Sequence, residues 1–105
     1  MILINLQIQI QPQQRQAWLA NIKAYTDAVR AEPGCIGFDC YASIDRPCEY
    51  AIVEAFTSKQ AGDDHVQTAH FKEFLTWFPT VIAASPRIIN TEVAGDGWTT
   101  MSEFN

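Results

Sequence analysis

The sequence has few basic residues and no long apolar run. Its 105 residues include 7 Lys or Arg against 12 Asp or Glu, which gives a net charge of −5. Nucleic-acid-binding proteins present clustered Lys and Arg, and this chain has no such cluster. No stretch approaches the roughly 20 apolar residues that cross a bilayer, and the chain opens on an alternating pattern rather than a signal-like segment. We therefore expect a cytoplasmic protein that binds neither nucleic acid nor membrane.

Cysteines are also scarce. The three present, Cys35, Cys40 and Cys48, include no pair with C-x-x-C spacing. An odd number at this spacing indicates neither a disulfide framework nor a zinc knuckle. Because Cys35 and Cys40 point to opposite faces of a regular strand, a disulfide between them is not expected. The sequence predicts three free thiols.

Aromatic residues, in contrast, are plentiful. They make up 11% of the chain and include three Trp. A chain of 105 residues that is 48% hydrophobic fits one domain with a small core. Surface scaling indicates that about 65% of the unfolded chain's surface becomes buried on folding. A small core cannot bury this many aromatic rings. We therefore expect a partner surface to cover the rings that stay exposed.

Four segments alternate apolar and polar residues with the period of a β-strand. They lie at residues 1–11, 35–44, 49–57 and 87–94. Between the first two, residues 12–31 have the 3–4 spacing of an amphipathic helix, which Pro12 opens and Glu32-Pro33-Gly34 ends.

A second helical region follows the third strand. Thr57 and Gln60 have the spacing of a capping box and predict a short helix. An apolar stripe over residues 71–82 predicts a further helix that faces the core. Pro79 lies within this stripe, so we expect a break near Trp77.

The order of these elements, β-α-β-β-α-β, predicts an α+β fold of the ferredoxin-like type. It has one four-stranded antiparallel sheet with helices on one face. The pattern turns the even-numbered residues of the first two strands toward the helices, together with the alanines of the third. The opposite face is then expected to carry Ile52, Glu54, Phe56 and Asn90. Aromatic and apolar side chains on an open sheet mark an interaction surface, so we expect a second copy to cover it as a homodimer.

Three motifs occur in succession along these elements. Glu32-Pro-Gly-Cys-Ile-Gly-Phe-Asp-Cys-Tyr-Ala-Ser is followed by Glu54-Ala-Phe56 and then by His65-x-x-x-x-His70-Phe71-x-x-Phe74. In this order they resemble the antibiotic biosynthesis monooxygenase family over residues 1–94. The resemblance implies a dimeric α+β barrel, with a cavity between sheet and helices near the dimer seam. Residues 95–105 then form a tail that is expected to pack on the partner subunit.

The resemblance implies an oxygenase reaction less specifically than it implies the fold, since the family also includes isomerases and haem-degrading proteins. An oxygenase without flavin or metal needs an electron-rich substrate, such as a quinol or phenol. A base deprotonates it in a dry pocket before it reduces dioxygen. The candidate catalytic residues are Glu54, His65 and His70, because burial raises the pKa of a carboxylic acid and histidines titrate near neutrality. A structural reading also stays open, in which Glu54 and His65 only link a strand to a helix and His70 is a surface residue.

The candidate substrate-binding residues fall into two chemical groups. Polar side chains that can hydrogen-bond substrate oxygens are Asn5, Gln7, Tyr41 and Asn90. Side chains that can contact an aromatic ring are Phe56, Phe71, Phe74 and Trp77. Phe71 and Phe74 also fit a core stripe, because helical spacing alone predicts it.

No metal or cofactor is expected from the sequence. His65 and His70 lie about 140° apart around a continuous helix and would meet at one ion only if a break separated them. Haem-degrading relatives carry a histidine further along this helix, and residues 72–77 contain none. The sequence therefore favours a cofactor-independent monooxygenase that uses dioxygen on a small aromatic substrate. Two alternatives remain open: an isomerase or tautomerase of a small metabolite, and a non-catalytic dimer that binds a small ligand.

Overall fold

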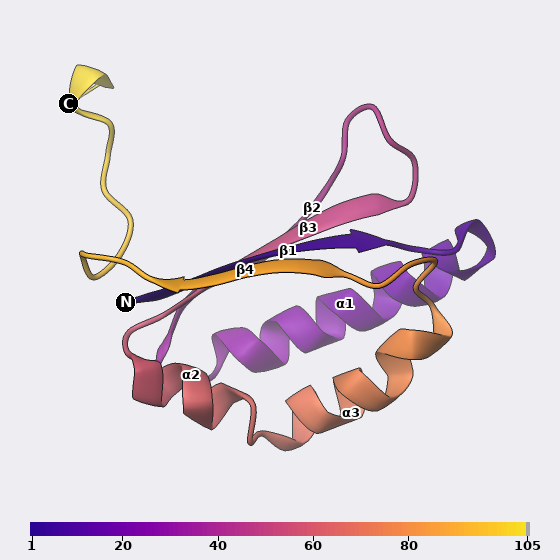
Figure 1. Ribbon diagram of the computed structural model, residues 1–105, viewed down its shortest axis with the longest axis horizontal. Helices are drawn as coiled ribbons and strands as arrows, with labels where there is room; N and C mark the ends of the chain where they lie inside the picture. Colours follow the sequence, from indigo (N-terminus) through magenta and orange to yellow (C-terminus); the bar gives the residue numbers. More distant parts are fainter. Residues whose placement is uncertain (105) are drawn as a thin grey trace.

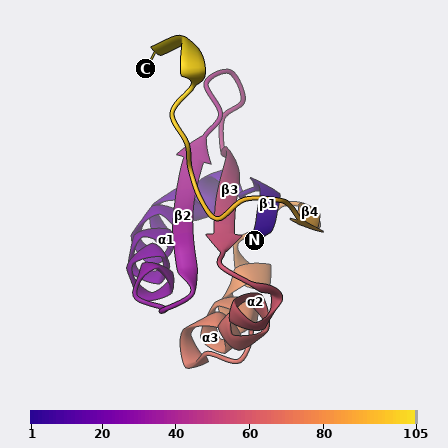
Figure 2. The same ribbon diagram turned by 90° about the vertical axis from the view of Figure 1, so that its left-hand side faces the viewer.

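Four antiparallel strands form one sheet in the order β2-β3-β1-β4 in the computed structural model, which describes residues 1–104 (Figure 1). The strands are β1 (Ile2–Gln9), β2 (Cys35–Ala42), β3 (Glu49–Phe56) and β4 (Arg87–Glu92). The helices are α1 (Arg15–Arg30), α2 (Lys59–His65) and α3 (Ala69–Trp77). All three helices lie on the same side of the sheet (Figures 1 and 2). The predicted ferredoxin-like α+β fold is confirmed.

Short 3₁₀ turns stand where proline interrupts the helices. Pro12–Gln14 precedes α1, and Phe78–Thr80 follows α3. The second turn confirms the predicted break near Trp77, because Pro79 has no amide hydrogen to continue the helical ladder. A third 3₁₀ turn lies in the tail at Ser102–Phe104.

The pairing of β1 with β3 decides which side chains face the helices. Ile2 lies opposite Phe56 and Ile4 opposite Glu54, and directly opposed residues of antiparallel strands share a face. Ile2 and Ile4 are buried in the core cluster, so the even-numbered residues of β3 also point toward the helices. The prediction that Ile52, Glu54 and Phe56 lie on the open face is therefore wrong. The alternation misled because β3 is apolar on both of its faces.

The same register moves Asn90 away from the open face. Asn90 lies opposite Ile4 and thus on the helix side, along an edge strand whose residues are all exposed. Asn5, Gln7 and Tyr41 lie on the open face as predicted, and Ile89 joins them opposite Asn5.

A β-bulge changes the direction of one cysteine. The pairing of β2 with β3 shifts between Cys35 and Gly37, so that Ile36 is the extra residue. Cys35 then lies opposite Phe56 and Cys40 opposite Ile52, which puts both thiols on the helix side. The expectation of opposite faces is wrong, whereas the expectation that the cysteines are free is confirmed.

An aromatic cluster fills the space between α1, α3 and the sheet. The ring of Trp18 is fully buried and stacks on Trp77 with ring centroids 6.2 Å apart and planes inclined by 4°. Tyr25 stacks on Phe74 at 4.2 Å, and Phe74 packs against Phe78 at 4.8 Å. These contacts fix α3 against α1. They therefore set the position of every side chain that α3 presents.

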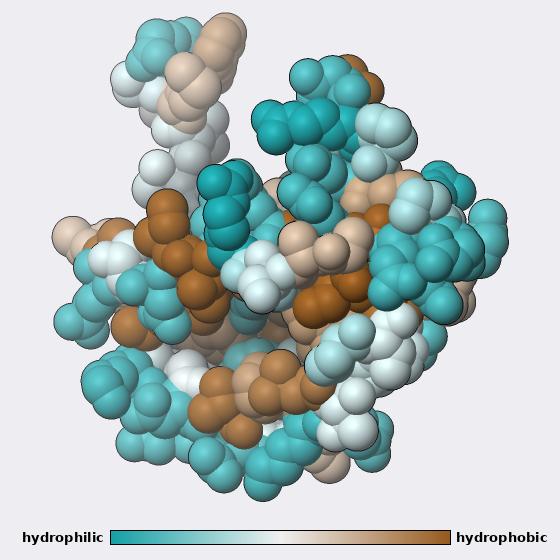
Figure 3. Space-filling model, turned by 45° about the vertical axis from the view of Figure 1, so that its right-hand side comes forward, coloured by the Kyte–Doolittle hydropathy of each residue, from teal (hydrophilic) through white to brown (hydrophobic). Residues whose placement is uncertain are grey.

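The chain after β4 passes the ends of β1 and β3 toward β2 and then leaves the body of the molecule on the side opposite the helices (Figures 1 and 2). The indole nitrogen of Trp98 lies 3.5 Å from the position that a Cβ atom would take at Gly37. Trp98, Met101 and Phe104 are exposed. On the surface drawn in Figure 3, apolar side chains gather in separate patches between polar ones. Among the described residues, no helix has the length and apolar character needed to cross a membrane.

Candidate active site

A break between α2 and α3 brings two histidines together. α2 ends at His65, and α3 begins after Thr68. The Thr68 hydroxyl accepts a hydrogen bond from the Phe71 amide at 3.2 Å and donates one to the His65 carbonyl at 2.8 Å. It thereby caps the new helix and closes the turn between the two. His65 and His70 can therefore converge, because the helix between them is not continuous.

The first helix of this pair begins one residue later than the capping box predicts. Ser58, and not Thr57, is the N-cap of α2, and its hydroxyl accepts a hydrogen bond from the Ala61 amide at 3.1 Å. The helix ends at His65.

Glu32 lies between the two histidine rings. Its Oε2 atom is 2.9 Å from Nδ1 of His65 and 2.6 Å from Nε2 of His70. Its other oxygen, Oε1, also contacts Nδ1 of His65, at a distance of 3.2 Å. The side chains of His65, Glu32 and His70 are 5%, 11% and 28% exposed, so only the His70 ring reaches solvent to a substantial extent. We call these three residues the histidine cluster.

Glu54 lies behind His65, on the helix side of β3. Its Oε1 atom is 3.7 Å from Nε2 of His65, which is an ionic distance and longer than a hydrogen bond. The same oxygen is buried and has no hydrogen-bond partner among the described residues. Burial, and secondly the charge of Glu32, raise the pKa of Glu54 to about 7. Glu54 therefore keeps its proton to a higher pH than an exposed carboxyl group does.

Tyr25, from α1, covers the histidine cluster on the helix side. Its ring centroid is 6.0 Å from that of His70 and 6.5 Å from that of His65. Burial, followed by the charges of Glu54 and Glu32, raises the pKa of Tyr25 well above its ordinary value. Its hydroxyl therefore stays protonated and remains a hydrogen-bond donor throughout the neutral range.

Phe56 and Phe71 pack around His65. Their ring centroids lie 4.8 Å and 5.1 Å from the His65 ring. Phe56 is fully buried, so it contacts the histidine cluster from within the core. The sequence predicted Phe56 and Phe71 as contacts for an aromatic substrate ring. In the structure both rings pack on His65 and keep water away from it.

A groove of about 410 Å³ runs between α1 and α3 beside the histidine cluster. Of the three catalytic candidates, His70 lines this groove, and Glu54 and His65 do not. Two predicted aromatic contacts, Phe74 and Trp77, line it as well. The full set of lining residues is Asn21, Ala24, Tyr25, Ala28, His70, Glu73, Phe74 and Trp77.

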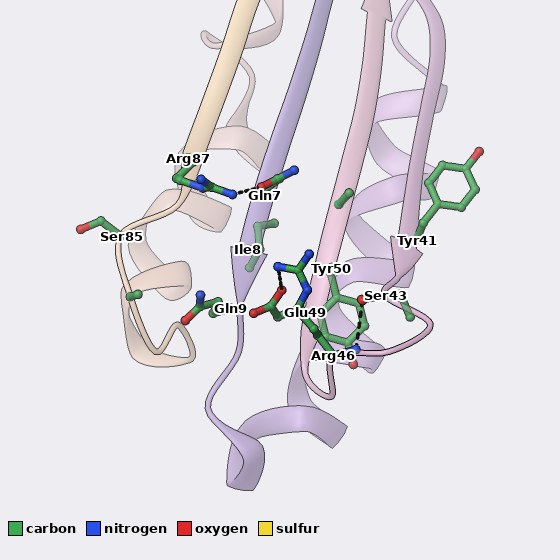
Figure 4. Close-up of a pocket in the computed structure, with 13 residues that line it drawn as sticks. Gln7, Ile8, Gln9, Tyr41, Ser43, Arg46, Glu49, Tyr50, Ser85 and Arg87 are labelled. Atoms are coloured by element: carbon green, nitrogen blue, oxygen red, sulfur yellow. Dashed lines mark hydrogen bonds and ion pairs between the residues drawn. The ribbon is translucent and has the colours of Figure 1, made fainter.

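A second hollow, of about 390 Å³, lies on the open face (Figure 4). Gln7 and Tyr41 line it, and Gln7 accepts a hydrogen bond from the Arg87 guanidinium. Arg46 forms an ion pair with Glu49 at 3.3 Å at its other side. The sheet separates this hollow from the histidine cluster.

The structure therefore separates the predicted site residues into two groups, one on each face of the sheet. Asn5, Gln7 and Tyr41 lie on the open face, and Asn90 lies on the exposed edge strand. The groups brought together on the helix side are Glu54, His65, His70, Phe56, Phe71, Phe74 and Trp77.

Sequence reasoning missed Glu32 and Tyr25. Glu32 belongs to a Glu-Pro-Gly segment that reads as a helix stop, and Tyr25 belongs to the core stripe of α1. A signal for Glu32 in the sequence is its place at the start of the Glu-Pro-Gly motif that carries the family resemblance. The fold alone reveals that both histidines turn toward it.

The histidine cluster is also the donor set of a possible metal site. One ligand atom from each of Glu32, His65 and His70 lies within 4.8 Å of the others. Donor atoms around one zinc ion stand roughly 3.0–3.5 Å apart, given metal–ligand distances near 2.0–2.2 Å. The contacts of 2.6 and 2.9 Å to the carboxylate are instead those of charge-assisted hydrogen bonds.

The family model for antibiotic biosynthesis monooxygenase matches residues 1–77. The chain belongs to this family. Among curated proteins, the chain is 27% identical over 81 residues to the uncharacterized protein sll1783 of Synechocystis. This match covers 77% of the chain but 55% of that protein. The chain is 23% identical to "Putative monooxygenase YcnE" of Bacillus subtilis, over 90% of this chain and 99% of that protein. The chain thus spans about half the length of the first of these relatives.

Solved structures with low sequence identity share the fold. Rv0793 from Mycobacterium tuberculosis has a TM-score of 0.83 at 22% identity, over 90% of this chain and 96% of that one. PA3566 from Pseudomonas aeruginosa has a TM-score of 0.79 at 19% identity, over 90% and 94% of the two chains. The family thus fixes the architecture in which the histidine cluster is built.

Proposed function

We propose that this protein is a cofactor-independent monooxygenase that oxidises a small phenol- or quinol-type substrate with dioxygen in the α1–α3 groove. The observation that carries the proposal is the position of His70. It lines the groove beside Trp77 and Tyr25, and the Glu32 carboxylate lies 2.6 Å behind it. A base backed by a buried acid beside aromatic side chains suits deprotonation of an aromatic hydroxyl.

The chemistry requires no electron carrier, because the substrate supplies all the electrons. His70 takes the hydroxyl proton, and the electron-rich phenolate passes one electron to dioxygen. The two radicals then join in a carbon–oxygen bond, and the peroxide takes up a proton. Loss of water, with the hydrogen of the attacked carbon, leaves a quinone. For a naphthol the balance is C₁₀H₈O + O₂ → C₁₀H₆O₂ + H₂O, in which the substrate loses four electrons.

Glu54 and His65 have a different place in this proposal from His70. Neither lines the groove, so neither meets the substrate directly. They belong to the buried charge network that backs His70, with Glu54 at its inner end.

The proposal includes a homodimer built on the open face of the sheet. Ile89 and Tyr41 expose 67% and 56% of their surfaces there, and Trp98 of the tail adds a third exposed apolar side chain. Apolar side chains gathered on one sheet face are typical of an interface. The histidine cluster and the groove are formed within one subunit.

Oxygen consumption tests the proposal. Purified protein, treated with EDTA and dialysed, is given reduced naphthoquinones and naphthols while dissolved oxygen is recorded. We expect uptake above the buffer blank and a fall in kcat of about 10²- to 10⁴-fold in His70→Gln. The matched control on the same helix, Lys72→Gln, keeps wild-type uptake because Lys72 does not line the groove.

Three outcomes would overturn the proposal. Uptake at the blank rate across the whole phenol panel rules out the oxygenase reaction. Activity lost with EDTA and restored by Fe²⁺ or Zn²⁺ rules out cofactor independence and points to the histidine cluster as a metal site. Wild-type uptake in His70→Gln rules out His70 as the base.

An isomerase or tautomerase is the second candidate, because a histidine–carboxylate pair transfers protons without dioxygen. Exchange of substrate C–H for deuterium in D₂O, with no oxygen uptake, would identify this activity.

A further inference from the structure

We infer that Glu32 is a positioning residue that holds the two histidines in opposite tautomers. His70 carries its proton on Nε2 and presents Nδ1 as the base, whereas His65 carries its proton on Nδ1. The catalytic consequence rests on the proposed function, but the tautomers themselves do not.

The tautomers follow from what each group can donate. A neutral imidazole has one N–H donor and one acceptor nitrogen, and an ionised carboxylate only accepts. Oε2 of Glu32 faces Nε2 of His70 at 2.6 Å and Nδ1 of His65 at 2.9 Å. Both of these nitrogens must therefore carry the hydrogen. The lone pairs are left on the other nitrogen of each ring.

For His70, this arrangement leaves Nδ1 free to take a proton. When it does so, the ring becomes a cation that the Glu32 carboxylate already contacts. A carboxylate in this position orients an imidazole and stabilises its charged form. Because Glu32 is 89% covered, water competes weakly for its oxygens.

For His65, the free lone pair on Nε2 points toward Glu54 rather than the groove. Oε1 of Glu54 lies 3.7 Å from this nitrogen and has no hydrogen-bond partner within residues 1–104. The protonated form of Glu54 is the one that complements a lone pair, since it offers an O–H. The groups that face this pair are Tyr25 from α1, Glu32 from the loop after α1 and the ring of His70 from α3.

The two hydrogen bonds that Glu32 accepts also give His65 a role in orienting the carboxylate. His65 is 5% exposed in its side chain and does not line the groove. Its Nδ1–H contacts both oxygens of Glu32, at 2.9 and 3.2 Å. His65 therefore holds the carboxylate in the orientation that His70 requires.

Nitrogen-15 NMR measures the tautomers directly. The chain has only two histidines, so the imidazole region contains only these two rings. At pH 8, we expect His70 to show an unprotonated Nδ1 and a protonated Nε2, and His65 to show the reverse. A His70 ring with its lone pair on Nε2 would overturn the inference.

Three variants separate positioning from folding. In Glu32→Ala, both rings should become tautomer mixtures, and kcat should fall about 10²- to 10⁴-fold while KM stays within about twofold. In His65→Asn, the side-chain amide can replace the Nδ1–H donor, so His70 keeps its tautomer. Asp63→Asn, which removes an exposed acid paired with Lys59, should leave both spectra unchanged.

The outcomes distinguish this inference from the proposed function. Opposite tautomers in a protein without oxygenase activity support the positioning role and remove only the reaction. An unchanged His70 spectrum in a folded Glu32→Ala protein contradicts the role of Glu32, whatever the activity. Should Glu32→Ala not fold, Glu32→Leu provides the same comparison, because it removes both acceptor oxygens and keeps most of the side-chain volume.

Discussion

Glu54 is an acid held among apolar side chains, with one oxygen that has no hydrogen-bond partner among the described residues. Burying a charge without full compensation is unfavourable, and the protein avoids part of that cost by keeping Glu54 protonated to a higher pH. The stability of the protein should therefore depend on the protonation of this one residue.

The sign of that dependence can be worked out. Burial and the charge of Glu32 raise the pKa of Glu54 from 4.5 to about 7. Between these values the folded state holds more protons than the unfolded one, so stability falls as pH rises through this window. Below it, Glu54 is protonated in both states. The full difference is about 3 kcal/mol.

Glu54→Gln removes this dependence. Its free energy of unfolding relative to wild type should rise by about 3 kcal/mol between pH 4 and pH 8, as measured by urea unfolding. Asp63→Asn is the matched exposed control and should give the same difference from wild type at both pH values. A Glu54→Gln difference that does not change with pH would contradict the raised pKa of Glu54.

Among single residues, the sequence predicted the raised pKa of Glu54 but not the face of the sheet on which Glu54 lies. Histidine and a strand carboxylate stood out by type and spacing. The face of Glu54 was missed because apolar residues occupy both faces of β3, so alternation gives no direction there. Glu32 was missed because its partners lie 33 and 38 residues away in the chain.

At the scale of elements, the break between α2 and α3 forms the site. A capping-box pattern predicted the first helix, apolar periodicity predicted the second, and Pro79 predicted the end of the second. Periodicity does not locate the junction between them, which depends on the hydrogen bonds of Thr68. Thr68 also has no acidic residue three positions later, so it lacks the capping-box pattern.

The two helix caps offer a matched pair of substitutions. Thr68→Ala and Ser58→Ala should each lower the free energy of unfolding by about 1 kcal/mol, because each removes one N-cap hydrogen bond. Thr68→Ala should also lower kcat, since Thr68 anchors the turn from His65 to α3, and Ser58→Ala should not. Urea unfolding and oxygen uptake measure the two effects. Equal effects of both substitutions on kcat would contradict a role for the break.

At the scale of the whole molecule, the aromatic load divides between the core and the surface. Trp18, Tyr25, Phe74 and Phe78 stack between α1 and α3. Trp98 and Phe104, by contrast, expose 75% and 78% of their surfaces. The abundance of rings that the composition showed thus corresponds to real exposed surface in a single copy.

Light scattering checks the proposed dimer. A chain of 11.8 kDa should give a mass of about 24 kDa. Ile89→Asp, on the open face, should reduce the mass toward that of one chain, because it places a charge in the apolar interface. Leu75→Asp changes an exposed apolar residue of α3 and should leave the dimer intact. A wild-type mass near 12 kDa at micromolar concentration would contradict the proposal.

The four-stranded sheet has the histidine cluster on one side and the open face on the other. Alternate side chains of each strand point to one side or the other. In a strand, neighbouring positions such as Val53 and Glu54 therefore belong to different surfaces. A change at an odd position of β3 therefore alters the open face, on which we propose the dimer, and leaves the face that carries the histidine cluster unchanged. An engineer can use this separation to attach, immobilise or re-pair the protein through one surface while selecting new substrates through the other.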